Sequence, residues 1–136
     1  MGLDTSAAAM DMFAKADLLI FQNRTEEAKA MMGQLENTFP GHALADDILF
    51  RRGTIAYKQR EYEKAAEYWE QVLADFSTDI LADNALFNLA DLYETYLNEP
   101  SKAQQYYQTI MVDFPGSLFT VEARKRFRKL RGDTIN

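Results

Sequence analysis

The chain has 136 residues, of which 47% are hydrophobic and 26% are charged, a composition typical of a single folded domain with a sizeable core. Its net charge of −6 disfavours binding to nucleic acid and to anionic lipid, because both would repel it. Cysteine is absent, which excludes disulfides, thiolate metal sites and thiol nucleophiles. No apolar run approaches the roughly 20 residues that span a bilayer, so we expect no membrane insertion.

Helical periodicity runs along the whole chain, and no segment shows the alternation of a strand. The pattern predicts an all-α chain with helices at 7–22, 25–38, 43–58, 62–75, 80–96, 101–113 and 117–131. Pro40 and Pro115 follow two of these helices, and proline ends a helix because it lacks the amide donor and clashes with the preceding turn. Asp79 and Ser117 are expected to cap the helices that follow, since their side-chain oxygens can accept hydrogen bonds from exposed amides.

Three columns of residues recur along the chain every 37 or 38 positions. The columns are Phe13, Phe50 and Phe87; Phe39, Phe76 and Phe114; and Ala28, Ala65 and Ala103. A period of this length is typical of stacked helix hairpins, each of which buries an apolar face of its neighbour. We therefore predict one domain, 1–136, with repeats at 7–41, 43–78 and 80–116 and a capping helix at 117–131. Because a repeat begins almost at Met1, we also expect the chain to be a piece of a longer array.

Residues inside each repeat resemble the tetratricopeptide repeat, whose first helix carries a small residue and whose second carries alanine, an aromatic residue and proline. The matching positions are Met12, Ala16, Leu19, Ala28, Met32 and Pro40, then Leu49, Gly53, Ala56, Ala65, Trp69 and Ser77, then Leu86, Ala90, Tyr93, Ala103, Tyr107 and Pro115. Lys15 and Arg52 replace the leucine that the family prefers, and the period is longer than the family's 34 residues. The resemblance implies a right-handed α-solenoid of about three helix hairpins plus a C-terminal capping helix.

Two strings resemble a subtype of these repeats found in bacterial cell-envelope proteins. Residues 114–117 read Phe-Pro-Gly-Ser, and residues 85–90 read Ala-Leu-Phe-Asn-Leu-Ala. Proteins of this subtype include the outer-membrane assembly lipoprotein and the coordinator of the Tol–Pal system. The resemblance implies an adaptor of the periplasm or cell envelope, with the cytoplasm as the alternative location.

The sequence shows no constellation of catalytic or metal-binding residues. His42 is the only histidine, so neither a zinc site nor a Ser–His pair can be assembled in the usual ways. The glycines are scattered and form no phosphate-binding loop. Five glutamates fall on outer faces of the second helices, which is typical of a solvated surface: Glu26, Glu27, Glu63, Glu67 and Glu70. We therefore expect no enzymatic activity, no catalytic residue, no cofactor and no metal.

The last predicted helix is basic, with Arg124, Lys125, Arg126, Arg128, Lys129 and Arg131. Such a helix in an acidic chain can bind nucleic acid or lipid headgroups. A capping role is favoured, because a packing stripe persists in this helix and the terminal helix of a stack needs one polar face. Positive charge near a helix C-terminus also interacts favourably with the helix dipole. We therefore expect no nucleic-acid partner.

The best candidate for a binding site is the concave groove that stacked hairpins form with their first helices. By the repeat register, a phenylalanine of each repeat lies on or beside this groove, and polar or aromatic residues follow it at helical spacing. The predicted partner-binding residues are Phe13, Asp17, Phe50, Thr54, Tyr57, Phe87, Asp91 and Glu94. Aromatic residues flanked by carboxylates suit a peptide with apolar anchors and some basic character. The alternative for the phenylalanines is a packing column between neighbouring first helices.

The sequence thus predicts a non-catalytic interaction module or adaptor that docks a protein or peptide partner in its groove. The alternative is self-assembly into a homo-oligomer as a segment of a larger scaffold, because the end of a helix stack exposes an uncovered apolar face. That face is expected on the N-terminal helix, around Met10, Met12, Phe13 and Leu18.

Overall fold

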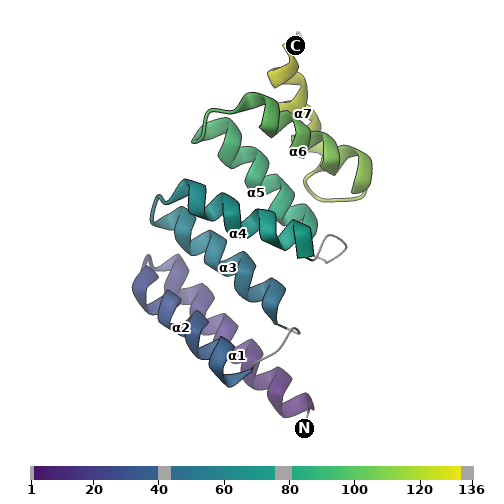
Figure 1. Ribbon diagram of the computed structural model, residues 1–136. Coiled ribbons are helices and arrows are strands. Elements are labelled where there is room, and N and C mark those ends of the chain that lie inside the picture. Colours follow the sequence, from purple (N-terminus) through teal and green to yellow (C-terminus); the bar gives the residue numbers. More distant parts are fainter. Residues whose placement is uncertain (1, 40–43, 76–80, 133–136) are drawn as a thin grey trace. The chain divides into compact units, whose positions relative to one another are not determined.

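A computed structural model describes residues 2–39, 44–75 and 81–132, with side chains from Ala7 onward (Figure 1). These residues form seven α-helices and no strand, which confirms the all-α prediction. The helices are α1 (Gly2–Phe21), α2 (Thr25–Thr38), α3 (Ala45–Lys58), α4 (Tyr62–Asp75), α5 (Ala82–Thr95), α6 (Pro100–Asp113) and α7 (Thr120–Arg131). The predictions for Pro40, His42, Phe76 and Asp79 concern positions outside the described residues.

The starts of two helices differ from the prediction by more than two residues. Helix α1 begins at Gly2 instead of residue 7, and α7 begins at Thr120 instead of residue 117. Ser117 is therefore not the N-cap of α7, and that prediction was wrong. Its hydroxyl oxygen accepts a hydrogen bond from the amide of Phe119 at 3.1 Å and donates one to Asp83 at 2.6 Å. These two bonds stabilise the turn before α7. A serine hydroxyl can accept a hydrogen bond from a nearby backbone amide in a turn as well as at the start of a helix.

The turns between the two helices of each hairpin share a residue with positive φ, although the third turn is one residue longer than the other two. One residue of each turn lies in the left-handed region, with φ of 62° at Asn23, 63° at Arg60 and 55° at Asn98. The next amide donates to a carbonyl near the end of the preceding helix: Arg24 to Leu19, Glu61 to Ala56 and Glu99 to Tyr93. Bonds of this kind satisfy carbonyls that the end of a helix would leave unpaired. The three hairpins are therefore α1–α2, α3–α4 and α5–α6.

The chain divides into two compact units, Met1–Tyr68 and Trp69–Asn136. In the first unit, α2 packs against both α1 and α3. The core of this unit consists of Phe13, Ala16, Ile20, Ala28, Met32, Leu35, Ile48 and Ile55. Ala28 is fully buried, as expected for a small residue that lets a neighbouring helix approach closely.

In the second unit, α6 packs against α5 on one side and against α7 on the other. The fully buried residues of the second unit include Leu89, Leu92, Ala103, Tyr107, Ile110 and Ala123. The hydroxyl of Thr120, at the start of α7, donates to the carbonyl oxygen of Phe114 at 2.8 Å. Helix α7 therefore covers α6 through buried contacts, which agrees with the capping role predicted for it.

Candidate partner-binding surface

The eight predicted groove residues lie on the three first helices, α1, α3 and α5, and the structure shows what each of them contacts. Phe13 on α1 is buried and belongs to the core of the first unit. Phe50 on α3 and Phe87 on α5 are each partly exposed. For Phe13 the structure therefore shows the packing role, whereas the other two rings keep some surface open to solvent.

Arg51 ties α3 to α1 in the first unit. Its guanidinium lies over the ring of Phe13, 4.4 Å from the ring centroid. The same group donates two hydrogen bonds to the carboxylate of Asp17, at 2.8 and 3.1 Å, and a third to Asp47 at 3.2 Å. Burial works to lower the pKa of Arg51, but bonding to these carboxylates raises it above its usual value. A bidentate guanidinium–carboxylate pair of this kind fixes the relative orientation of the two side chains in addition to pairing their charges.

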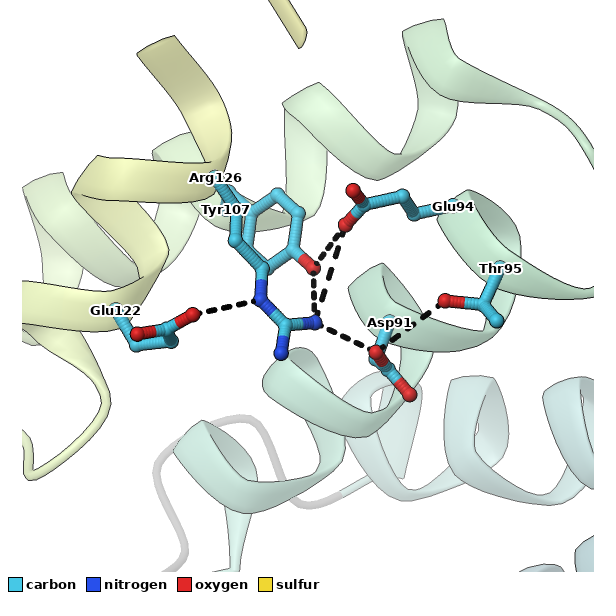
Figure 2. A network of polar contacts seen from close by, with 6 residues as sticks. All are labelled: Asp91, Glu94, Thr95, Tyr107, Glu122 and Arg126. Carbon is cyan, nitrogen blue, oxygen red and sulfur yellow. Dashed lines mark hydrogen bonds and ion pairs between the residues drawn. The ribbon is translucent and has the colours of Figure 1, made fainter. Parts of the chain in front are cut away.

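Arg126 makes the equivalent contacts in the second unit, where it connects α7 to α5 (Figure 2). Its guanidinium lies 5.2 Å from the centroid of the Phe87 ring and donates to Asp91 at 2.6 Å. It also donates to Glu122, one turn earlier on α7, at 2.9 Å. This bond lowers the pKa of Glu122, because it stabilises the ionised carboxylate. Phe87 and Asp91 thus contact Arg126 as Phe13 and Asp17 contact Arg51.

Tyr107 of α6 joins the second cluster, whereas the equivalent position of α2 is Met32. Its hydroxyl donates to Glu94 at 2.7 Å and accepts a hydrogen bond from Arg126 at 3.2 Å (Figure 2). Burial, followed by the bond to Glu94, raises the pKa of Tyr107 above its usual value. The ring also packs edge-on against Phe87, which is stacked on Phe119 with centroids 4.8 Å apart. Tyr107 and Arg126 therefore each take part in both the aromatic contacts and the polar contacts of this cluster.

The middle repeat presents a less polar face. Phe50, Thr54 and Tyr57 follow one another at helical spacing along α3, and all three are partly exposed. The hydroxyl of Thr54 donates to the carbonyl of Phe50 at 3.3 Å, so it is partly satisfied within its own helix. Tyr57 packs edge-on against Tyr62 across the hairpin turn, with centroids 5.8 Å apart. This stripe supplies aromatic surface without a carboxylate of its own.

Sequence reasoning missed the importance of Arg51 and Arg126 for this surface. A repeated signal marks both: each arginine follows an acid by four residues, Asp47 or Glu122, and each lies 38 or 39 residues after a groove phenylalanine. The expectation that Glu70 is merely solvated was also wrong. Its carboxylate accepts hydrogen bonds from Tyr93 at 3.0 Å and Tyr106 at 2.8 Å.

Chemically, this surface consists of carboxylates, guanidinium groups and aromatic rings. Among the residues that the structure describes, no cluster of histidine, aspartate or glutamate is placed to hold a metal ion. Within the same residues, no helix is both long and apolar enough to cross a membrane.

The hairpins and their shared turn define an all-α repeat protein, and comparison with known families identifies the repeat. Family models described as Tetratricopeptide repeat match residues 46–79 and residues 84–117. Together the two matches cover half of the chain, and they contain α4 and α6 in full. The chain belongs to the tetratricopeptide repeat family. No curated protein matches the sequence. Repeats of this family generally mediate protein–protein interaction and are not catalytic.

Proposed function

We propose that the chain is a non-catalytic interaction module that docks a basic segment of a partner protein on the exposed faces of its first helices. The first-helix face is defined by Asp17, Phe50, Thr54 and Tyr57 in the first unit and by Phe87, Asp91 and Glu94 in the second. The observation that carries the proposal is that carboxylates outnumber the guanidinium groups in both arginine clusters, and that every carboxylate except that of Glu94 is more exposed than the arginine it contacts.

In the first unit, Arg51 contacts two carboxylates, those of Asp17 and Asp47. The side chain of Asp17 is 53% exposed, whereas that of Arg51 is only 20% exposed. The positive charge is therefore largely covered, and the solvent meets carboxylate oxygens that still have lone pairs to offer. A lysine or arginine of a partner can bind there without displacing Arg51.

In the second unit, Arg126 lies within 4 Å of three carboxylates, those of Asp91, Glu94 and Glu122. The side chain of Glu122 is 45% exposed, against 30% for Arg126. The excess of negative charge is larger here than in the first unit. A partner segment with basic residues can therefore bind either cluster, and complementary charge of this kind accelerates association and sets specificity.

Aromatic surface supplies the apolar part of the proposed contact. Phe50 and Tyr57 present partly exposed rings on α3, and Phe87 does so on α5. Rings of this kind give a large contact area at low cost in conformational entropy, and peptides that dock on helical surfaces insert apolar anchors between them. The preferred partner segment therefore combines basic residues with leucine or an aromatic residue.

The test uses short fluorescein-labelled peptides that alternate lysine with leucine, and matched peptides in which glutamate replaces lysine. We expect fluorescence anisotropy to show that only the lysine peptides bind, and that the double variant Asp17→Asn, Asp91→Asn binds them roughly fivefold more weakly. The control variant Glu63→Gln, Glu67→Gln removes the same charge from exposed positions of α4. Equal weakening in both variants would show unspecific attraction to an acidic protein and would contradict the proposal.

A second candidate function is self-assembly through α1. Met10, Leu18 and Phe21 form an exposed apolar stripe on this helix, and Phe21 is 80% exposed. Leu18 is 55% exposed, whereas the residues 37 and 74 positions later, Ile55 and Leu92, are 1% and 0% exposed. In the first unit, Ile55 shares a core with residues of α2. Leu18 occupies the equivalent position on α1 but is exposed, so another helix can pack on it. A second copy of the chain can supply that helix.

The exposed apolar residues of α1 differ from those that the sequence predicted for a self-assembly face. Met12 and Phe13 were expected on it, but Phe13 lies in the core and Met12 packs against that core. Sedimentation velocity over a range of concentrations should therefore show a dimer that Leu18→Glu with Phe21→Glu abolishes. A monomer at all concentrations in the unmodified chain would reject this second function and leave the first-helix face unaffected.

A further inference from the structure

A cavity of about 240 Å³ lies in the first unit, lined by residues of α2, α3 and the part of α4 up to Tyr68. It opens on a different face of α3 from the one that carries Arg51, because its lining residues on that helix are Arg52, Ile55 and Ala56. The cavity is therefore separate from the first-helix face.

Three cations from three different helices converge on this cavity: Lys29 of α2, Arg52 of α3 and Lys64 of α4. The one carboxylate among the lining residues is that of Glu61. The lining thus has a surplus of positive charge in a chain whose net charge is −6. Local charge of the opposite sign to the whole molecule marks a position where a negatively charged group is attracted from solvent.

The three cations differ in how far they are already neutralised. Arg52 donates two hydrogen bonds to Glu36, at 2.9 and 2.7 Å, and these bonds lower the pKa of that carboxyl group. The ammonium of Lys29 is 3.8 Å from Glu26, a carboxylate that also accepts a 2.6 Å hydrogen bond from Gln59. Lys64 has no hydrogen bond or ion pair within the described part of the chain. Lys29 and Lys64 are therefore the two groups able to accept a new anionic partner.

Size and lining decide what kind of partner fits. Pockets for small organic ligands are typically about 300–1,000 Å³, so a cavity of about 240 Å³ suits one or two side chains better. Its floor is apolar, since Ile55 and Ala56 are buried there, and the partly buried ring of Tyr68 forms a wall.

We propose that this cavity binds an aspartate or glutamate of a partner protein, next to an apolar residue of the same segment. Lys29 and Lys64 hold the carboxylate, and the apolar neighbour packs on Tyr68 and the floor. The chain then offers two docking surfaces of opposite preference, because the first-helix face takes basic segments. A module of this kind can hold two partners at once.

The test uses two short fluorescein-labelled peptides that differ only in having glutamate or glutamine beside a leucine. We expect the glutamate peptide to bind the unmodified chain more tightly, and Lys29→Gln with Lys64→Gln to weaken its binding roughly fivefold. The matched control, Lys15→Gln with Lys58→Gln, removes two exposed lysines that do not line the cavity, and should leave binding within about twofold. Circular dichroism checks that both variants remain folded.

Three results would overturn the proposal: equal weakening in the control, unchanged binding in the cavity variant, or equal affinity for the glutamine peptide. Tighter binding of a matched phosphoserine peptide would assign the cavity to phosphate and would also overturn it. Binding of the glutamate peptide should perturb the amide resonances of Ile55 and Gln59. It should persist in the Asp17→Asn, Asp91→Asn variant, which separates this proposal from the first-helix face.

Discussion

The two units of this chain fix a neighbouring helix in the same way but with different amounts of polar contact. In each unit an arginine covers a phenylalanine of an earlier first helix and bonds to the aspartate four residues further along that helix. Arg51 bonds to the carboxylates of Asp17 and Asp47 and to the carbonyl oxygen of Asp47, whereas Arg126 bonds to carboxylates and to Tyr107 of the intervening second helix. The comparison teaches that arginine, phenylalanine and aspartate are the shared part, and that the tyrosine is an addition of the second unit.

Hydroxyl contacts extend further in the second unit. Tyr93 and Tyr106 both donate to Glu70, and the ammonium of Lys102 lies 3.7 Å from the same carboxylate. In the first unit the contacts beyond Arg51 include an ion pair between Arg52 and Glu36 and a hydrogen bond from the side-chain amide of Gln59 to the carboxylate of Glu26. The first unit therefore depends more on ion pairs and the second more on protonated tyrosines, so the two should respond differently to pH.

The largest difference is expected from removal of the two aromatic rings. Phe13→Ala should lower the free energy of unfolding by about 3 kcal/mol, because it leaves a cavity in the core of the first unit. Phe87→Ala should cost about 2 kcal/mol, since that ring is partly exposed but stacks on Phe119. Urea denaturation followed by circular dichroism measures both values. A larger loss for Phe87 would show that the second aromatic cluster, and not the first core, is the stronger of the two.

Removal of the arginines should rank the two clusters in the opposite order. Arg126→Met should cost about 2 kcal/mol, because Asp91, Glu94 and Glu122 then repel one another without compensation. Arg51→Met should cost about 1 kcal/mol, since the carboxylate of Asp17 is mostly exposed and easily solvated. Amide hydrogen exchange, resolved by segment, should show faster exchange in α7 for the first variant and in α3 for the second. Equal costs would mean that the extra contacts of Arg126 contribute nothing.

A rise in pH should separate the units without any mutation. Burial, followed by bonding to Glu70 or Glu94, raises the pKa of Tyr93, Tyr106 and Tyr107 above the unfolded value of about 10. At a pH between the unfolded and the folded pKa, the unfolded chain binds fewer protons than the folded chain. The stabilisation from these tyrosines is therefore fully present below about pH 10 and is lost as the pH rises above that value. Hydrogen exchange in α5 and α6 should therefore accelerate above about pH 10 before that in α1 and α2. Simultaneous acceleration would argue against a special role of these hydroxyls.

The smallest predicted effect is a gain in stability. Gly33 lies within α2, and a β-carbon added there meets no atom within 4 Å. The corresponding position of α6 is Gln108, which is a better helix former than glycine. Gly33→Ala should therefore raise the free energy of unfolding by about 0.5–1 kcal/mol, chiefly by restricting the unfolded chain. A melting temperature that falls would show that α2 needs flexibility at this point.

The fold could be predicted because its signals are local and repeated. Ala28 and Ala103 are fully buried at equivalent positions of α2 and α6, as the repeat register required. Pro100 begins α6, which agrees with the tolerance of a first helical turn for proline. The start of α7 was misplaced because Ser117 can satisfy an amide in a turn as readily as at a helix end.

The site could be predicted only in part, because its contacts join residues far apart in the sequence. The register correctly placed Phe87 and Asp91 one turn apart on a first helix. It could not show that Arg126, which is 35 residues beyond Asp91, reaches back to both. That contact depends on the reach of a long side chain between packed helices, which spacing does not encode. The location in the cell envelope stays a prediction, since helix packing does not depend on the compartment.

The shared hairpin turn gives the chain three equivalent attachment points for chemical probes. Asn23, Arg60 and Asn98 are exposed, and all three have positive φ. Because the long side chain of Arg60 is accommodated there, the turn tolerates side chains other than glycine and asparagine. The chain contains no cysteine, so one cysteine introduced at any of these positions would be the only thiol present. Three singly labelled proteins, each with a dye on a different hairpin, would then report where a partner arrives first.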